Sequence, residues 1–584
     1  TPSSPDLKNI HWHVEKIAVV GPGIVGMPMA AMLANARIRE DGDHPAKVLV
    51  VQRNSPTSGW KVEAINRGES PIGGIEPGLD DMVRETVGAG ILSATHDYSQ
   101  LRDADVVLVC VQTDKDGLEP DYGPLMGALT AIAEELRHKP GANTPLIVFE
   151  STLAPSTMAT VIRDHFREYG LHERRDILLG NSPNRVMPGR LVERVAQSDK
   201  IVAGLHPLTP LLISKLYDRI VTDGTLHPTN SMTAEVVKTL ENAYRDVRIA
   251  YSAEVARYCD ENDIDFYAVR ETVNERLAQQ DAASADPNAV PSGGLLIPTV
   301  GVGGHCLPKD GILLWWRALE KGQDTSRSLI LEARRINDES PAEAVRLAER
   351  AFGKLDDRSV ALMGTAYRFN SEDTRNSPTL ELAKLLLAKG CTVRLHDPFV
   401  KSDDQNLVRY ELTDLFTREA DVALERAEIV FFCTGHRVYM QERDALLGSA
   451  PELVGVVDGA NLFDETRIRA HDIGYTGIGR GHRQPDSAFV DAVLQGFRVM
   501  ERGVANEVGA LVEFLNEHFA ADDFTQVEFE DMRRIARTCS TGCEIVDRGG
   551  VDPPTAYRGF LPRLVGTALG QPLAPAYRRE RSLP

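Results

Sequence analysis

The sequence predicts an α/β protein with two doubly wound domains, a helical central domain between them and a mostly helical C-terminal extension. Three observations lead to this fold class. The chain of 584 residues is too long for one hydrophobic core. Two parts of it alternate short apolar runs with helix-like segments, as parallel sheets covered by helices do. The part between them repeats apolar residues every three or four positions, which indicates long helices.

The first α/β domain is predicted over residues 1–225. Its apolar runs have the length of strands and are separated by helix-like segments. They lie at 16–20, 47–52, 105–112, 145–150, 177–180 and 200–204. Apolar strands of this kind predict a parallel sheet that is buried on both faces.

The central domain is predicted over residues 226–340. One face of its first long helix carries Val237, Leu240, Tyr244, Val247, Tyr251 and Val255. Such an apolar face suits a dimer interface and an internal core equally well.

The second α/β domain is predicted over residues 341–482, with strands at 360–363, 392–396, 429–433 and 454–457. The extension, 483–584, contains a predicted amphipathic helix over 488–519. Its apolar face carries Phe489, Val493, Phe497 and Met500. We expect this face to pack on the rest of the chain.

The composition excludes two classes of partner. A formal charge of −20 provides no basic surface for nucleic acid or an anionic membrane. No apolar run reaches the roughly 18–20 residues of a membrane span. Seven cysteines without regular spacing, and an N-terminal segment unlike a signal peptide, favour a cytoplasmic protein. We expect a small-molecule substrate and no metal ion.

The clearest nucleotide-binding motif is G-x-G-x-x-G, which follows a predicted strand and opens a predicted helix. In Rossmann-like domains these glycines allow a tight turn and bring backbone N–H groups close to a pyrophosphate, which the helix dipole attracts. We therefore predict that Gly21, Gly23, Ile24, Val25 and Gly26 bind a dinucleotide. A glycine turn that only packs a helix on a strand is the alternative.

Gln52 and Arg53, at the end of the second strand, leave the identity of the dinucleotide open. An acidic residue usually binds the ribose hydroxyls of NAD at this place. Gln52 can hydrogen-bond a 2′-hydroxyl, whereas Arg53 suits the 2′-phosphate of NADP. NAD is the prediction and NADP the alternative.

Cys306 is the predicted nucleophile. It lies in a glycine-rich loop just before a helix-like segment. The N-terminus of a helix and the positive charge of Lys309 both favour a reactive thiolate. Asp310 can cap this helix and also orient a hydrolytic water. A buried structural cysteine is the alternative, and we expect it for the other six.

Lys238, Asn242 and Arg245 occupy positions i, i+4 and i+7 of the predicted central helix, so they share one face. An ammonium and an amide presented together can stabilise an oxyanion during acyl transfer. A solvated polar face is the alternative.

Together these features resemble the UDP-glucose/GDP-mannose dehydrogenase family, from about residue 14 to residue 482. Many separate motifs fit that family in the same order, which makes the resemblance specific. They lie at 71–79, 150–155, 181–183, 238–242, 303–310, 373–378, 397–398 and 477–481.

The resemblance implies a Rossmann-like NAD-binding domain, a central domain that usually builds a homodimer, and a Rossmann-like domain that binds the UDP-sugar. It also implies the chemistry, a step of polysaccharide biosynthesis. Two hydrides pass from the sugar to two NAD molecules. Cys306 captures the intermediate aldehyde, and water hydrolyses the resulting thioester.

By the same resemblance, Lys238 and Asn242 stabilise the oxyanion, and Asp310 and Thr152 serve the water and the proton transfers. Arg375 would contact the UDP moiety or bridge subunits. Thr113 and Thr152 join the expected cofactor contacts. The expected substrate contacts are Asn184, Arg185, Lys238, Asn242, Arg245, Gly303 and Arg375.

The segment 241–247 is similar to enzymes that act on UDP-N-acetylhexosamines. UDP-N-acetyl-D-mannosamine is the predicted substrate, giving the mannosaminuronate, and UDP-glucose and UDP-N-acetylglucosamine are open alternatives. Three residues depart from the family pattern: Gln52, Asn184 in place of a glutamate, and Arg368 in place of a lysine. They affect cofactor preference and proton transfer more than the reaction class.

Two other classes of function stay open. A one-step hydroxy-acid dehydrogenase would not need the thiol of Cys306. A non-catalytic nucleotide-sugar-binding scaffold would be expected to lose that thiol first.

Overall fold

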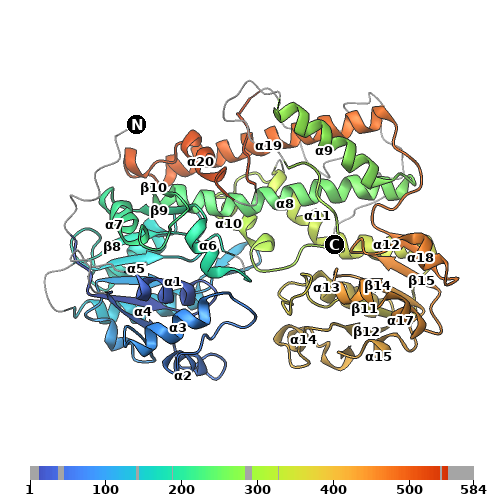
Figure 1. Cartoon of the computed structure of the whole chain (residues 1–584). Coiled ribbons are helices and arrows are strands. Elements are labelled where there is room, and N and C mark those ends of the chain that lie inside the picture. The colour runs from blue at the N-terminus through green and yellow to red at the C-terminus, as the bar shows by residue number, and fades with distance from the viewer. Residues whose placement is uncertain are drawn as a thin grey trace. The chain divides into compact units, whose positions relative to one another are not determined.

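The computed structural model describes residues 12–36, 45–139, 144–186, 188–282, 293–326, 328–539 and 542–549 (Figure 1). The remainder of the predicted extension, 550–584, lies outside the described residues. The chain forms two compact units. Unit 1 comprises Thr1–Glu241, Leu313–Gln323 and Val508–Cys543, and unit 2 comprises Asn242–Ile312, Asp324–Glu507 and Glu544–Pro584. Three of the five boundaries along the chain fall inside helices, namely α8 (Ser231–Glu261), α10 (Leu307–Glu320) and α19 (Ser487–Phe519).

Unit 1 is built on a doubly wound sheet with the strand order β10-β9-β8-β7-β4-β1-β2-β3. Its strands are β1 (Lys16–Val20), β2 (Lys47–Val51), β3 (Leu92–Thr95), β4 (Val106–Val109), β7 (Leu146–Phe149), β8 (Leu178–Asn181), β9 (Lys200–Gly204) and β10 (Leu226–Asn230). The strand order reverses between β1 and β4. In such sheets ligands bind at the carboxyl ends of the strands beside the reversal.

The strands predicted for the first domain all form, and the structure adds β3 and β10 at the two edges of the sheet. Strand β3 has only four residues, and β10 contains Pro228, which weakens its strand pattern. The prediction of a wholly parallel sheet is wrong for one pair, because β8 and β9 are antiparallel. An apolar run carries no information on strand direction. A short hairpin of β5 (Asp114–Asp116) and β6 (Glu119–Asp121) lies outside this sheet.

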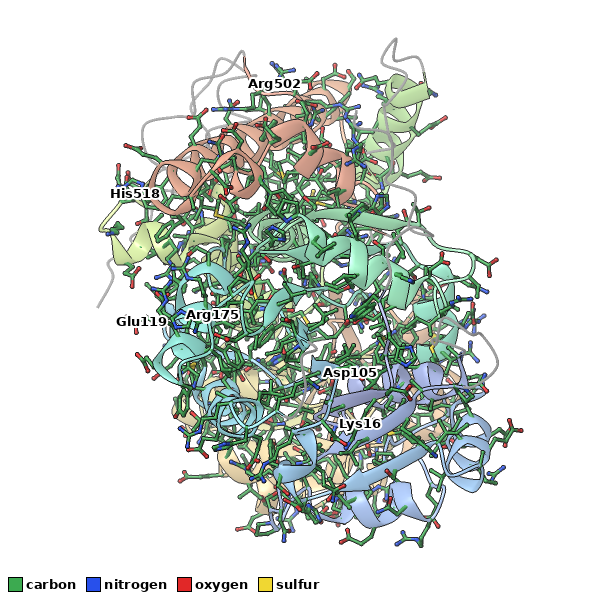
Figure 2. All side chains as sticks on the ribbon, turned by 90° about the vertical axis from the view of Figure 1, so that its left-hand side faces the viewer. Lys16, Asp105, Glu119, Arg175, Arg502 and His518 are labelled. Carbon is green, nitrogen blue, oxygen red and sulfur yellow. The ribbon has the colours of Figure 1, made fainter. Side chains whose placement is uncertain are left out.

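Both faces of this sheet are buried, as the apolar strands predict. On β1, Ile17 and Val19 contribute to one core cluster and Ala18 and Val20 to another, as the two-residue period of a strand requires. Where β1 begins, the Asp105 carboxylate accepts the backbone N–H of Lys16 at 3.2 Å (Figure 2). The α-helices that lie wholly within unit 1 are α1 (Gly26–Asn35), α2 (Trp60–Asn66), α3 (Leu79–Gly88), α4 (Gly123–Leu136), α5 (Arg163–Glu168), α6 (Leu191–Gln197), α7 (Leu208–Tyr217) and α20 (Phe529–Ala536).

Unit 2 contains a second doubly wound sheet, with the order β13-β12-β11-β14-β15-β16 and all neighbouring strands parallel. Its strands are β11 (Ser359–Met363), β12 (Thr392–His396), β13 (Phe416–Thr417), β14 (Ile429–Phe432), β15 (Gly455–Asp458) and β16 (Gly474–Gly477). The helices around it are α12 (Ser340–Phe352), α13 (Pro378–Ala388), α14 (Gln405–Arg409), α15 (Ala420–Leu424), α16 (Arg437–Gln441), α17 (Arg443–Gly448) and α18 (Glu465–Arg469). The helical part of the unit adds α9 (Phe266–Ala282) and α11 (Leu329–Asp338). The predicted α/β fold class is therefore confirmed.

The long helix of the extension, α19, packs along α8 in unit 2 (Figure 1). The Tyr251 hydroxyl donates to the carbonyl of Val493 at 2.7 Å, and the rings of Tyr258 and Phe489 stack with centroids 5.0 Å apart. Phe497 lies against Tyr251 and is fully buried. The expectation that this apolar face packs on the rest of the chain is confirmed, and the apolar face of α8 is internal core. Among the described helices, none has the length and apolar character needed to cross a membrane.

Candidate active site

The dinucleotide loop follows β1 in unit 1 and has two positions that only glycine fits. Gly21 has a φ of +95°, and a Cβ there would lie 2.8 Å from the carbonyl oxygen of Cys110. A Cβ on Gly26 would lie 2.1 Å from the carbonyl oxygen of Gly21. The first glycine therefore permits the turn, and the second permits α1 to start directly against it.

Gly23 has a different role, because no atom lies within 4 Å of the position that its Cβ would take. Next to it Ile24 is exposed, and α1 begins at Gly26 with no acidic residue in its first turn. Open space beside a helix N-terminus without a competing carboxylate fits an anionic pyrophosphate. These residues would hold NAD, which accepts a hydride when bound.

Alanine substitutions at Gly23 and at Gly26 are expected to have different effects. Gly23→Ala should leave the thermal midpoint of unfolding unchanged and raise the KM for NAD about tenfold, since the methyl occupies ligand space. Gly26→Ala should lower the thermal midpoint as well, because its methyl meets the Gly21 carbonyl. Thermal unfolding and NAD titration of both variants measure this. Normal NAD binding by the Gly23 variant would show that the space is not used by the cofactor.

Other predicted cofactor residues lie along the same sheet edge. The buried Thr113 hydroxyl donates to the carbonyl of Thr152 at 2.7 Å, which joins the segments after β4 and β7. Gln52 donates through Nε2 to Ser58 Oγ at 3.0 Å and to the carbonyl of Arg53. This leaves the Gln52 amide oxygen as the acceptor for a ribose hydroxyl, and Arg53 is exposed.

Asn184 belongs to a buried polar cluster around Glu150. Asn184 Nδ2 donates to the Glu150 carboxylate at 3.0 Å, Lys200 Nζ pairs with it at 2.7 Å, and the Tyr217 hydroxyl donates to it as well. Burial raises the pKa of Tyr217 well above its usual range, and the charge of Glu150 adds to this. This cluster was not predicted. The one available signal was Glu150 itself, the glutamate that ends the predicted strand 145–150.

The side chain of Arg185, the next residue, is buried in unit 1. Its guanidinium forms an ion pair with Glu241 of α8. Glu241 directly precedes Asn242, one of the predicted catalytic residues. Glu241 was not among the predicted site residues.

Cys306 directly precedes α10 in unit 2, as predicted. It is exposed, whereas the other cysteines of the described residues are buried or half-buried. Its carbonyl accepts the backbone N–H groups of Lys309 and Asp310 at 3.1 and 2.9 Å, which fixes the first turn of the helix. Lys309 is buried, and its Nζ lies 3.2 Å from His305 Nε2. The thiol is thus presented at a rigid helix N-terminus.

Asp310 and Asn242 form the main polar contact beside this cysteine. Asn242 Nδ2 donates to Asp310 Oδ2 at 2.6 Å, and the Asp310 side chain is fully buried. Asp310 Oδ1 has no hydrogen-bond partner among the described residues, and Lys309 Nζ lies 3.8 Å from it. A buried carboxylate oxygen without a hydrogen-bond donor is suited to hold a water molecule. On α8, Lys238 stands one turn before Asn242, and its side chain makes no hydrogen bond or ion pair with any described residue.

The loop after β11 holds the cysteine loop in place. The N–H of Gly304 donates to the carbonyl of Arg375 at 2.8 Å, and Asn376 Nδ2 donates to the carbonyl of Gly304 at 2.9 Å. A Cβ on Gly303 would lie 2.4 Å from Tyr367 Cβ, so the Tyr367 ring excludes any side chain there. Arg375 itself pairs with Asp373, which raises the pKa of the guanidinium. Tyr367 was missed because no local pattern relates it to Gly303.

The remaining predicted residues are less informative. Arg245 is half-buried on α8, and Arg368 is exposed, with its guanidinium 6.0 Å from the Phe369 ring centroid. Their assigned or suspected roles stay predictions.

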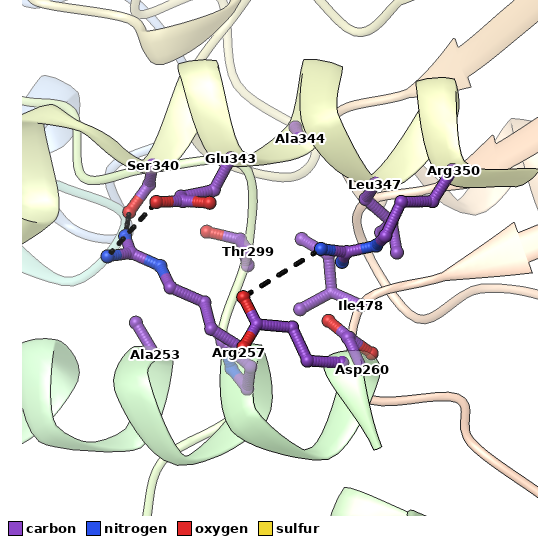
Figure 3. Close-up of a pocket in the computed structure, with 12 residues that line it drawn as sticks. Ala253, Arg257, Asp260, Thr299, Ser340, Glu343, Ala344, Leu347, Arg350 and Ile478 are labelled. Carbon is purple, nitrogen blue, oxygen red and sulfur yellow. Dashed lines mark hydrogen bonds and ion pairs between the residues drawn. The ribbon is translucent and has the colours of Figure 1, made fainter. Parts of the chain in front are cut away.

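A small hollow between α8 and α12 in unit 2 is not a substrate site (Figure 3). Its volume is about 30 Å³, which leaves room for water only. Arg257 reaches across it to donate to Ser340 at 2.9 Å, and its Nη1 lies 4.0 Å from Glu343. Burial raises the pKa of Asp260, which also lines the hollow, to about 7.

A glycine loop at the reversal of one Rossmann-like sheet, together with an exposed cysteine at a helix N-terminus, defines a dinucleotide-dependent dehydrogenase that carries a thiol. Models of three domains match the chain: the NAD-binding domain at residues 15–221, the central domain at 232–339 and the UDP-binding domain at 361–465. The chain belongs to the UDP-glucose/GDP-mannose dehydrogenase family. Its cofactor is NAD.

Several characterised proteins are similar to this chain. A UDP-N-acetyl-D-mannosamine dehydrogenase of Pyrococcus horikoshii is 31% identical over 471 residues, which are 80% of this chain and 99% of that protein. An NDP-N-acetyl-D-galactosaminuronic acid dehydrogenase of Ralstonia nicotianae is 29% identical, over 78% of this chain and 97% of that protein. The crystal structure of an NDP-N-acetyl-D-galactosaminuronic acid dehydrogenase from Methanosarcina mazei superposes with a TM-score of 0.68 at 32% identity, covering 80% of this chain and 96% of that one. The family models end at residue 465, before the C-terminal extension begins.

Proposed function

We propose that the chain is a UDP-sugar 6-dehydrogenase that oxidises the C6 hydroxymethyl group to a carboxylate. Residues 1–225 would bind NAD and residues 341–482 the UDP moiety. The observation that carries the proposal is the arrangement at the start of α10, where an exposed Cys306 stands four residues before a buried Asp310 that is bonded to Asn242. A one-step alcohol dehydrogenase needs no such nucleophile.

The proposed reaction converts one hydroxymethyl group, two NAD⁺ and one water into one carboxylate and two NADH, and it releases three protons. The first hydride leaves C6 as the hydroxyl loses its proton, which gives an aldehyde. The Cys306 sulfur adds to the aldehyde carbon and forms a thiohemiacetal. The second hydride leaves the same carbon, which gives a thioester. Water then adds to the acyl carbon, and the Cys306 thiol departs.

Each assigned side chain has a role in this series of reaction steps. Negative charge develops on the C6 oxygen when sulfur or water adds to the carbon, and Lys238 and Asn242 on one face of α8 provide an ammonium and an amide for it. Asp310 Oδ1, which lacks a hydrogen-bond donor, holds and deprotonates the attacking water. Thr152 serves the proton transfers. Asn184, Arg185, Arg245, Gly303 and Arg375 complete the proposed substrate contacts.

UDP-N-acetyl-D-mannosamine is the proposed substrate, and its uronate is the product. Support comes from the relatives named UDP-N-acetyl-D-mannosamine dehydrogenase, which align over almost their whole length. UDP-glucose and UDP-N-acetylglucosamine are the alternatives within the family. The dehydrogenases named for N-acetyl-D-galactosaminuronic acid make UDP-N-acetylgalactosamine, the C4 epimer of UDP-N-acetylglucosamine, a further sugar to compare.

The homodimer implied by the resemblance stays a prediction. The apolar face of α8 in unit 2 is covered by α19 of the same chain. A second copy of the chain would therefore have to bind at another surface.

The test is to count NADH per sugar consumed, with each of these UDP-sugars offered separately and NADP tested beside NAD. Two NADH per UDP-N-acetyl-D-mannosamine, together with the uronate in the product, is the expected result. Two NADH from another sugar would keep the reaction and change the substrate. One NADH per sugar would favour the one-step dehydrogenase, and no reduction with any sugar would favour the scaffold.

A further inference from the structure

The C-terminal extension contacts Arg185, a predicted substrate residue of unit 1, as well as packing on α8. Helix α20 (Phe529–Ala536) lies near β10, where Asn230 Nδ2 donates to the carbonyl of Gln526 at 2.7 Å (Figure 1). Ile535, near the end of this helix, and Thr538, just after it, both contact Arg185. These residues follow the last family-model match by about seventy positions, so the contact is a property of this chain rather than of the three family domains.

Arg185 is held from two sides. Its Nη1 donates to Thr538 Oγ1 at 2.7 Å, and its Nη2 donates to the carbonyl of Ile535 at 3.2 Å. The same Nη2 pairs with the carboxylate of Glu241, and both side chains of this ion pair are buried. Such an ion pair is stable only when additional hydrogen bonds satisfy the guanidinium, and here the extension supplies two of them.

Glu241 connects this ion pair to the catalytic helix. It lies three residues after Lys238 and directly before Asn242 on α8, so a change in its position also moves these two residues. Arg185 comes from the loop after the carboxyl end of β8, where ligands bind in a doubly wound sheet. The ion pair therefore links the proposed substrate loop to the helix that carries the proposed oxyanion groups.

We propose that the extension positions this catalytic helix, with Thr538 and the carbonyl of Ile535 holding Arg185 in the orientation that pairs with Glu241. Thr538 is a positioning residue and touches neither substrate nor cofactor. The inference rests on the proposed function, because its effect is measured on the oxidation of the UDP-sugar. It gives the extension a role in the reaction itself.

The test compares Thr538→Val, which removes the hydroxyl at nearly constant shape, with Thr538→Ser, which keeps it. Thr538 is half-buried at the end of a helix, so the valine variant should fold. With NAD and the UDP-sugar saturating, kcat of the valine variant is expected to fall about tenfold, the loss typical of one hydrogen bond to a charged group. The serine variant should stay within about twofold of the parent. The KM for NAD should not change in either variant.

A double-mutant cycle separates this role from a general loss of structure. Arg185→Lys keeps the charge but cannot bridge Thr538 and Glu241 together, so it should lower kcat by itself. Adding Thr538→Val to it should cause no further fall, because the hydroxyl acts only through Arg185. Additive effects in the double variant, or an unchanged kcat in Thr538→Val, overturn the inference. A parent protein that oxidises none of the sugars overturns the proposed function and this inference with it.

Discussion

Replacing Cys306 by serine is expected to reduce formation of the uronate by roughly 10⁴-fold or more, the range seen when an enzyme loses its nucleophile. The serine hydroxyl is a far weaker nucleophile toward the aldehyde and a poorer leaving group in the hydrolysis step. NADH and uronate should be measured together, because the first hydride transfer does not need the sulfur. A trace of aldehyde with one NADH per sugar is compatible with the proposal.

The matched control is Cys391→Ser. Cys391 is buried in unit 2 and donates through Sγ to the carbonyl of Leu355 at 3.0 Å, a hydrogen bond that serine can keep. This variant should oxidise the sugar like the parent. If the Cys306 variant also forms uronate at the parental rate, the thioester route is wrong, because both oxidations then proceed without this sulfur.

The sequence predicted those parts of the site that depend on local pattern. The turn at Gly21 and the start of α1 follow from the spacing of glycines after an apolar strand. The place of Cys306 follows from a glycine-rich loop before a helix. Each of these features is encoded within about ten consecutive residues, so a local pattern is enough to predict it.

The parts that the sequence did not predict are contacts between distant segments. Tyr367 packs against Gly303. Glu150 accepts hydrogen bonds from Lys200 and Tyr217, and Thr538 accepts one from Arg185. No periodicity connects residues that lie 50 to 350 positions apart. The antiparallel direction of β9 relative to β8 was not predicted for a similar reason, because a run of apolar residues does not indicate the direction of its strand.

One such contact gives a physical reason for Asn184, which stands where the family pattern has a glutamate. Its Nδ2 donates to the carboxylate of Glu150, and Val186 donates its N–H to the Asn184 side-chain oxygen. A glutamate at this position would place a second carboxylate against Glu150, and like charges at this distance raise a carboxyl pKa or repel. The amide satisfies the cluster instead. Glu150 is therefore the carboxylate to which Asn184 donates, and it also pairs with Lys200.

Asp310→Asn is expected to separate the two halves of the reaction. The amide has nearly the shape of the carboxylate but cannot accept a proton from water, so hydrolysis should slow by about 10²–10⁴-fold. The two hydride transfers do not need this carboxylate. We therefore expect a rapid burst of two NADH per Cys306, followed by a slow steady state, and an acylated enzyme whose added mass hydroxylamine removes.

Stopped-flow absorbance of NADH and intact-protein mass measure these two results. Asp356→Asn, a change at an exposed carboxylate in unit 2, should give neither the burst nor the adduct. If Asp310→Asn slows the burst as much as the steady state, Asp310 acts before the thioester forms and not on the water. Its buried Oδ1 favours the first result, because a carboxylate oxygen with no protein donor is the atom that a water molecule would bind before attack.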